Sequence, residues 1–203
     1  MSRVRTRPTR DETRDKLFEA AARVFEEQGI GGASVEAVAA AAGFTRGAFY
    51  SNFKSMDELI IAMLEDHVDR SIRRNRELLA QHNNIEDFLE ALKNMDRTQD
   101  PLGRTPLLHM EMILYVARAE KRRPELAKRL RALRKLIADI VETTSKNSGR
   151  PGALNSAWIG AILLALEDGF RLHRLIDPET TPADSFLRAV GDLKRALGII
   201  ATS

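Results

Sequence analysis

Apolar residues recur along this chain at intervals of three and four positions, which is the period of an α-helix. Near the N-terminus, for example, Leu17, Ala21, Val24 and Phe25 fall at this spacing. No stretch alternates apolar and polar residues as a β-strand does, so we expect an all-α fold. Glycine, proline and capping residues divide the pattern into about nine helices, over residues 12–28, 35–41, 45–52, 56–76, 85–95, 106–119, 124–145, 153–176 and 182–198. Ser34 and Thr45 are the predicted N-caps of two of these helices.

Two helix boundaries carry specific predictions about backbone hydrogen bonds. Ser55 and Glu58 have the spacing of a capping box, in which the serine side chain accepts from the N–H of Glu58 and the glutamate side chain accepts from the N–H of Ser55. A polar loop is expected over residues 96–105. Its last residue, Thr105, is predicted to cap the helix that opens at Pro106.

The segment from residue 34 to residue 54 has the pattern of a helix-turn-helix. Ala39 supplies a small residue where two short helices cross, Gly43 tolerates the positive φ of the turn, and Phe49 anchors the second helix in a core. The same features also fit an ordinary helical hairpin in a bundle. The spacing alone therefore leaves two interpretations, a DNA-binding motif and a structural hairpin.

The residues that open the second of these helices favour DNA binding. Residues 45–47 are Thr-Arg-Gly, a polar turn at a helix N-terminus where backbone N–H groups can face a phosphate. The run Gly-Phe-Thr-Arg-Gly-Ala-Phe-Tyr at 43–50, followed by Asn-Phe-Lys-Ser at 52–55, resembles the signature of the TetR family of transcriptional regulators. The resemblance extends from Phe18 to Leu64.

That resemblance implies roles for individual side chains. Arg46 is expected to read a base edge in the major groove. Met56 stands where the family often has lysine, so we expect Lys54 to supply a phosphate contact at this place. Phe53 is expected in the core rather than at the DNA. The implied set of DNA-contacting residues is Ser34, Thr45, Arg46, Gly47, Tyr50, Asn52 and Lys54.

The net charge of the chain is small, so the positions of individual charged residues matter more than their sum. The whole chain has a formal net charge of +3, and its first sixty residues hold nine basic and nine acidic side chains. DNA binding must therefore depend on where individual charges stand. The basic arm at residues 1–10 is expected either to enter a minor groove or to remain a solvated tail. We expect a helix-turn-helix domain over 11–56 and a ligand-binding and dimerisation domain over 57–203.

The last two expected helices have the pattern of a subunit interface. The helix over 153–176 is apolar on every side between Ala157 and Leu166, so it needs neighbours on two faces. The helix after it has apolar residues alternately four and three apart, a seam for helix packing. A four-helix bundle shared by two chains is the simplest arrangement, and the resemblance implies it too; packing within one chain is the alternative. The predicted interface is Ala161, Ala165, Phe186, Val190, Leu193 and Leu197.

The resemblance also implies a small-molecule pocket in the C-terminal domain. An inducer bound there is expected to be hydrophobic, and the methionines between residues 95 and 112 offer an adaptable wall. For each apolar candidate, plain core packing is the alternative interpretation. The predicted lining is Phe88, Met95, Leu108, Glu111, Met112, Tyr115, Trp158, Ile162 and His173.

Composition narrows the class of protein further. The chain has no cysteine, which excludes disulfides and fits a cytoplasmic location. It has neither a glycine-rich phosphate loop nor a Gly-x-Ser-x-Gly motif, and we expect no enzymatic activity, metal or cofactor. The longest nearly apolar run, residues 157–166, is too short to span a bilayer, so no membrane association is expected.

Together these patterns predict a transcriptional repressor. We expect it to bind a palindromic operator in double-stranded DNA as a homodimer and to be released by a small-molecule inducer. The alternative is a helix-turn-helix protein that binds DNA constitutively and uses its C-terminal domain for protein interactions. A small all-helical enzyme is a third and weaker alternative.

Overall fold

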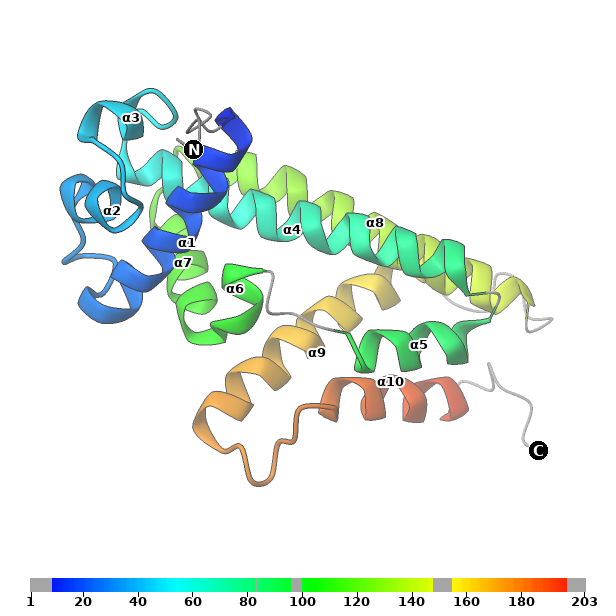
Figure 1. Cartoon of the computed structure of the whole chain (residues 1–203). Helices are drawn as coiled ribbons and strands as arrows, with labels where there is room; N and C mark the ends of the chain where they lie inside the picture. Colours follow the sequence, from blue (N-terminus) through cyan, green and yellow to red (C-terminus); the bar gives the residue numbers. More distant parts are fainter. Residues whose placement is uncertain (1–8, 83, 96–99, 148–154, 197–203) are drawn as a thin grey trace, which may run out of the picture. The chain divides into compact units, whose positions relative to one another are not determined.

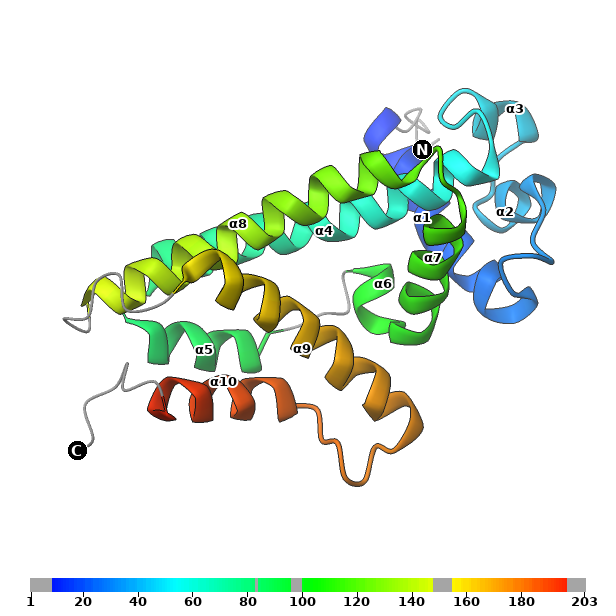
Figure 2. The same ribbon diagram turned by 180° about the vertical axis from the view of Figure 1, so that it is seen from behind.

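The computed structural model describes residues 9–82, 84–95, 100–147 and 155–196. Within these residues the chain forms helices and turns without a strand, which confirms the predicted all-α fold (Figure 1, Figure 2). The described helices number one more than predicted. They are α1 (Arg10–Gln28), α2 (Val35–Ala41), α3 (Arg46–Tyr50), α4 (Met56–Gln81), α5 (Ile85–Lys93), α6 (Pro101–Arg104), α7 (Pro106–Arg118), α8 (Arg123–Asn147), α9 (Ser156–Ile176) and α10 (Ser185–Ala196).

The helices group into two compact units. The first comprises residues 1–65 and 98–120, and the second comprises residues 66–97 and 121–203. Helix α4 therefore begins in the first unit and ends in the second, and α6 and α7 belong with α1, α2 and α3. The predicted boundary after residue 56 divides a DNA-binding domain from a ligand-binding and dimerisation domain. It does not coincide with the division into compact units, and it stays a prediction.

The first unit has an aromatic core that holds the short helices α2 and α3 against α1. Phe25 of α1, Phe49 of α3 and Leu59 of α4 are each at most 1% exposed. Phe53, in the turn after α3, stacks on Phe18 of α1 with ring centroids 5.7 Å apart, which confirms its expected place in the core. Truncating one of these phenylalanines to alanine is expected to cost about 3–5 kcal/mol.

Side-chain caps fix where the helices of the first unit begin. Ser34 and Thr45 each accept a hydrogen bond from the backbone N–H three residues on, at 3.1 and 3.3 Å, as the sequence predicted. Helix α1 begins two residues earlier than expected, because Thr9 and Glu12 form a complete capping box. The three-residue spacing of Thr9 and Glu12 is the signal in the sequence that could have located this start.

The predicted capping box of α4 forms in a shifted version. Ser55 Oγ accepts from the N–H of Glu58 at 3.2 Å, as expected. The carboxylate of Glu58, however, accepts from the N–H of Lys54 at 2.7 Å, one residue before the predicted donor. The glutamate thus closes the turn between α3 and α4 as well as the start of α4.

The loop expected over residues 96–105 contains a short helix, α6. Asp100 caps it by accepting from the N–H of Leu102 at 3.2 Å, and Pro101 supplies its first residue. Thr105 makes no side-chain cap for α7, contrary to the prediction. Its hydroxyl donates instead to the carbonyl of Pro101 at 2.6 Å, and this bond satisfies a carbonyl of α6.

In the second unit, α9 packs against α8 and also against α10. Both views show α5 lying beside α10 (Figure 1, Figure 2). Gly160 of α9 allows the close approach to α8, since a Cβ at this position would stand 3.1 Å from the backbone of Arg134 and of Ala138. Helix α10 begins at Ser185, three residues later than expected, after the turn at Pro182.

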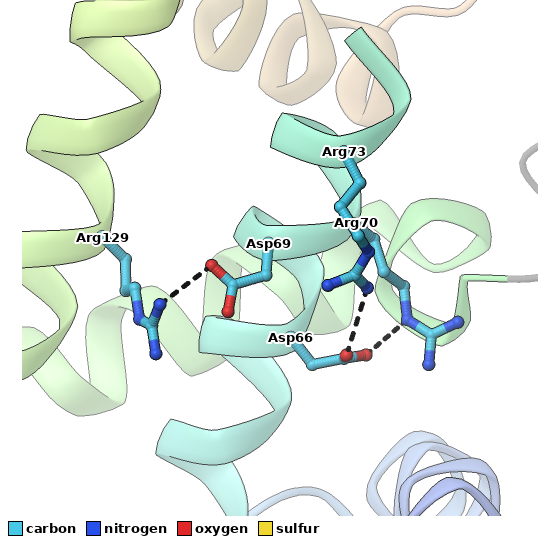
Figure 3. A network of polar contacts seen from close by, with 5 residues as sticks. All are labelled: Asp66, Asp69, Arg70, Arg73 and Arg129. Carbon is cyan, nitrogen blue, oxygen red and sulfur yellow. Dashed lines mark hydrogen bonds and ion pairs between the residues drawn. The ribbon is translucent and has the colours of Figure 1, made fainter. Parts of the chain in front are cut away.

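Ion pairs within α4, and one pair between α4 and α8, lie in the second unit (Figure 3). Asp69 of α4 accepts from Arg129 of α8 at 3.1 Å, which joins the two helices. One turn earlier, Asp66 pairs with Arg70 at 2.5 Å and lies 4.0 Å from Arg73. All five side chains are partly exposed, so each pair is expected to contribute at most about 1 kcal/mol and to set register more than stability.

Candidate nucleic-acid interface and ligand cavity

The turn between α2 and α3 has the geometry that a helix-turn-helix requires. Gly43 adopts a φ of +74°, a backbone conformation that side chains with a Cβ rarely tolerate. The N–H of Phe44 donates to the carbonyl of Ala39 at 2.8 Å and closes the turn. Ala39 is 1% exposed, which fits its expected place at the crossing of the helices. The predicted roles of Ala39, Gly43 and Phe49 are confirmed.

Helix α3 buries one face and exposes its first turn. Phe49 is fully buried, whereas Thr45, Arg46 and Gly47 are exposed. A Cβ at Gly47 would meet only the hydroxyl of Thr45, at 3.8 Å, so another molecule can approach the backbone here. The first turn of α3 can therefore meet a large polar surface without disturbing the core.

Arg46 is held by two neighbours on this surface. Its Nη1 lies 3.0 Å from Oε1 of Glu36 on α2, and its guanidinium stands over the ring of Tyr50, 5.4 Å from the centroid. A side-chain hydrogen bond with Tyr50 and the charge of Glu36 raise the pKa of Arg46 above its ordinary value. Nothing in the sequence pattern marks Glu36 as part of this surface. Its position next to a predicted base reader becomes apparent only once α2 and α3 are packed.

The other predicted DNA contacts lie on α2, on α3 and in the turn that follows. Ser34 is exposed at the start of α2, and Tyr50 is 44% exposed at the end of α3. Asn52 is half-buried, and its amide donates to the carbonyl of Ala48 at 2.9 Å, so it caps the end of α3. Lys54 is exposed. All seven predicted residues thus lie between residues 34 and 54, and their contact with DNA stays a prediction.

The second unit contains a cavity of about 270 Å³. Its wall is mainly apolar and comes from α4, α5, α8, α9 and α10. Representative lining residues are Phe88, Leu133, Ile137, Ile162, Phe186 and Val190. The volume is close to the lower end of small-molecule pockets, which begins at about 300 Å³.

Two of the residues predicted to line a pocket, Phe88 and Ile162, line this cavity. The others lie elsewhere, chiefly because α7 belongs to the first unit. Leu108 and Met112 are buried there, Tyr115 bonds to Asp57, and Glu111 is exposed. Outside the cavity lining in the second unit are Met95, half-buried after α5, and Trp158 and His173, both exposed on α9.

The predicted dimer residues fall into two groups. Phe186, Val190 and Leu193 of α10 line the cavity of their own chain. Ala161 is half-buried and Ala165 is exposed on α9. The remaining one, Leu197, lies outside the described residues, as does the basic arm before residue 9.

Helix α9 carries an exposed apolar stripe. Trp158 is 66% exposed and Leu172 is 47% exposed. From Trp158 to Ala161, then to Ala165 and then to Leu172, the intervals are three, four and seven residues. This spacing places all four side chains on one helical face. Gly160, which contacts α8, lies on another face of the helix. In the described part of the chain, no helix combines the length and the apolar character needed to cross a membrane.

A helix-turn-helix with an exposed first recognition turn, joined to a helical unit with an apolar cavity, defines a DNA-binding regulator. Residues 17–63 match the family model of the bacterial regulatory proteins of the tetR family, and residues 84–196 match that of a tetracyclin repressor-like C-terminal domain. The chain therefore belongs to the TetR family of transcriptional regulators, which are DNA-binding proteins rather than enzymes.

Curated relatives and solved structures agree with this membership. The transcriptional regulator UidR of Escherichia coli K12 is 24% identical over 161 residues, which is 77% of this chain and 79% of UidR. ArpR of Pseudomonas putida, a probable transcriptional regulator, is 35% identical over 88 residues, 43% of this chain and 40% of ArpR. The structure of reduced NemR from E. coli, 23% identical, superposes with a TM-score of 0.70 over 94% of this chain and 99% of NemR, which shows the shared fold.

Proposed function

We propose that this chain is a transcriptional repressor that binds a palindromic operator as a homodimer and is released from it by a small molecule. The observation that carries this proposal is the exposed first turn of α3, Thr45 to Gly47, on a buried core in a chain of this family. An exposed arginine at this place in a helix-turn-helix can reach base edges in the major groove.

Within the interface, we assign direct base readout to Arg46. Its planar guanidinium can donate two hydrogen bonds to O6 and N7 of a guanine. To do so it must leave the carboxylate of Glu36, which now lies 3.0 Å away. The remaining predicted residues are assigned to the sugar-phosphate backbone, where they fix register; they are Ser34, Thr45, Gly47, Tyr50, Asn52 and Lys54.

The proposed dimer interface is the apolar stripe of α9, formed by Trp158, Ala161, Ala165 and Leu172. A twofold contact through this stripe would bury the same residues of both chains. It would present two recognition helices to half-sites about 34–36 Å apart, one turn of DNA. The α10 residues that the sequence placed in this interface are assigned to the cavity wall instead, because they line it.

Helix α4 is the proposed route from ligand to DNA. Its residues Ser71, Arg74 and Asn75 line the cavity, and its first turns belong to the unit that carries α2 and α3. A ligand that binds better when α4 is in a DNA-incompetent position lowers operator affinity by the ratio of its two affinities. Typical coupling of this kind is about 1–3 kcal/mol, roughly 5- to 150-fold in operator affinity.

The test begins with selection of an operator from random double-stranded DNA by the full-length protein. We expect a palindrome whose half-sites are about one helical turn apart. Expression of a reporter behind this operator is expected to rise when the protein is removed. Operator affinity, measured by gel shift, is expected to fall when a cavity ligand is added. A protein that binds DNA constitutively would keep its operator affinity with every ligand that occupies the cavity.

A further inference from the structure

A polar patch on α4 interrupts the apolar wall of the cavity. Ser71, Arg74 and Asn75 stand three and four residues apart on this helix, so their side chains share one helical face, and all three line the cavity. The wall that α8 contributes is mainly aliphatic, with residues such as Leu133 and Ile137. The patch is therefore the place on α4 where a ligand in the cavity can form hydrogen bonds.

Ser71 and Asn75 keep part of their hydrogen-bonding capacity. The hydroxyl oxygen of Ser71 accepts from Nη2 of Arg74 at 2.8 Å, and Nδ2 of Asn75 donates to the carbonyl of Ser71 at 2.8 Å. That carbonyl can only accept, so the group of Asn75 that meets it must be the NH₂ and not the amide oxygen. Among the described residues, neither side chain makes a further hydrogen bond. One hydroxyl donor and one amide acceptor therefore remain at the wall.

The charged residues that line the cavity already have partners within the chain. They are Arg74, Glu167 and Lys194. Arg74 donates within the polar patch, the carboxylate of Glu167 lies 2.6 Å from Arg171, and the ammonium of Lys194 lies 2.5 Å from Glu86. A charged ligand would have to break one of these contacts or remain unpaired against an apolar wall, and both cost free energy. The cavity therefore favours an uncharged ligand.

The charges around the cavity also balance once a neighbouring carboxyl group is included. Asp168 follows Glu167 on α9 and interacts with Arg171 and with the buried His67. Burial, together with the charge of Glu167, raises the pKa of Asp168 above its ordinary value, and the charges of Arg171 and His67 act against this rise. The formal charges cancel between three basic and three acidic side chains, which are Arg74, Arg171 and Lys194 against Glu86, Glu167 and Asp168.

From these contacts we propose that the cavity binds an uncharged, largely aliphatic alcohol, with its hydroxyl group at Ser71 and Asn75 and its hydrocarbon part against α5, α8 and α10. The inference rests on the proposed function, since it names the chemical class of the ligand. A hydroxyl group donates one hydrogen bond and also accepts, so it can donate to Oδ1 of Asn75 and accept from the hydroxyl of Ser71. An ether or a carboxylate only accepts and an ammonium group only donates, so each leaves one of these two wall groups unmatched.

The size of the cavity limits the ligand. A volume of about 270 Å³ is roughly nine times the share of one water in the liquid, about 30 Å³. A ligand with on the order of ten non-hydrogen atoms therefore fills it. Octan-1-ol has this size and class. Its isomer heptyl methyl ether has the same size but no hydroxyl donor, and octanoate and octylammonium match its chain with an anionic and a cationic end.

The test is calorimetric titration of the full-length protein with these four probes at neutral pH. Octan-1-ol is expected to bind about five- to tenfold more tightly than heptyl methyl ether, because the ether leaves the amide oxygen of Asn75 without a donor. Octanoate and octylammonium are each expected to bind at least about tenfold more weakly than octan-1-ol. Equal affinity for the alcohol and the ether, tightest binding of either charged probe, or no heat from octan-1-ol up to its solubility limit would overturn the inference.

Variants on α4 locate the hydroxyl group of the ligand. Asn75→Leu removes the acceptor, so it is expected to lower octan-1-ol affinity about five- to tenfold while leaving the ether within about threefold of wild type. Gln81→Leu is the matched control, because it removes an amide from an exposed position of the same helix that does not line the cavity. Ser71→Ala removes the donor and is expected to weaken the alcohol and the ether alike, about fivefold. A folded Asn75→Leu protein, verified by circular dichroism, that still prefers the alcohol to the ether would contradict the assignment; so would a folded Ser71→Ala protein with wild-type affinity for both.

Operator affinity is measured separately on the same samples. If octan-1-ol binds in an Asn75-dependent manner and operator affinity stays unchanged, the ligand class stands and the proposed induction fails. If heptyl methyl ether or octanoate binds as tightly as octan-1-ol and releases the operator as well, the proposed function stands and the inference about the alcohol fails.

Discussion

The hydroxyl of Tyr115 in α7 donates a hydrogen bond to Oδ1 of Asp57 in the first turn of α4, with 2.6 Å between the two oxygens. This bond to Asp57, together with burial, raises the pKa of Tyr115 above its ordinary value, so the phenol remains a donor at neutral pH. Helix α7 is thereby tied to the start of α4, directly after the helix-turn-helix. The sequence had placed α7 in the wall of a ligand pocket.

We expect Tyr115→Phe to lower the free energy of unfolding by about 1–2 kcal/mol, because it removes a partly buried hydrogen bond to a charged group. Urea denaturation followed by circular dichroism measures this change. Tyr50→Phe is the matched control: Tyr50 is exposed, so the change should stay within about 0.5 kcal/mol. Equal stability of the two variants would show that the Tyr115–Asp57 bond contributes nothing to folding.

Arg46→Ala is expected to weaken binding of the selected operator by about 1–3 kcal/mol and to relax preference at one base pair in each half-site. Lys54→Ala should weaken all sequences alike and reduce the dependence of log K on log salt by about one unit. Gel shifts over a salt series, on the operator and on single-base variants of it, separate the two behaviours. An Arg46→Ala protein with wild-type affinity and preference would remove Arg46 from the base-reading set.

Glu36 is expected to oppose operator binding, since it holds Arg46 in the free protein and places a negative charge beside the DNA. The pair is exposed, so its effect is small: Glu36→Gln should tighten binding about two- to fivefold, and more at low salt. Fluorescence anisotropy with labelled operator measures this. Weaker binding by the variant would instead identify Glu36 as a reader of a cytosine amino group.

The parts of this fold that were predictable from sequence are those governed by short-range chemistry. Caps at Ser34 and Thr45, the glycine at position 43 and the period of α1 each depend on a few neighbouring residues, and all were found as expected. Helix α6 was missed because its four residues are too few to show a period.

The cavity was not predictable because the spacing of a hydrophobic seam does not indicate which helix packs against it. Phe186, Val190 and Leu193 have the spacing of a helix-packing seam, and the same spacing serves a contact within one chain as well as a contact between chains. In this chain these residues face a cavity whose other walls include Leu133 and Ile137 of α8. Only the tertiary arrangement distinguishes the two uses.

The ion pair between Lys194 of α10 and Glu86 of α5 predicts a pH dependence of stability. The hydrogen bond from Lys194 lowers the pKa of Glu86 below its ordinary value of about 4.5. The contribution of this ion pair to the free energy of unfolding is therefore complete above that value. It is lost as the pH falls through the lowered pKa of Glu86. Because Glu86 is 57% exposed, Glu86→Gln should cost about 1 kcal/mol or less at pH 7, and less still in acid.

Chemical denaturation of the wild-type protein and of Glu86→Gln, at several pH values between 7 and 3, measures the difference in their free energies of unfolding. Glu90→Gln is the matched control, one turn further along α5, where the carboxylate accepts from Asn94 at 2.9 Å rather than from a lysine. A cost of Glu86→Gln that stayed constant into acid would mean that the pair with Lys194 does not stabilise the folded chain.

The proposed dimer interface predicts that a charge in the centre of the α9 stripe separates the two chains. In Ala165→Glu the new carboxylate would lie near its own symmetry mate and against apolar neighbours such as Trp158. We expect a monomer at micromolar concentration by sedimentation velocity. Operator affinity should fall steeply with it, since one chain reads only one half-site.

Ala132→Glu provides the matched control, because Ala132 is exposed on α8 and is not part of the α9 stripe. It introduces the same charge on another helix of the second unit and should leave both the dimer and operator affinity intact. Both variants should retain wild-type helicity. A dimer that survives Ala165→Glu would move the interface away from α9, and a wild-type protein that sediments as a monomer at micromolar concentration would remove the proposed dimer altogether.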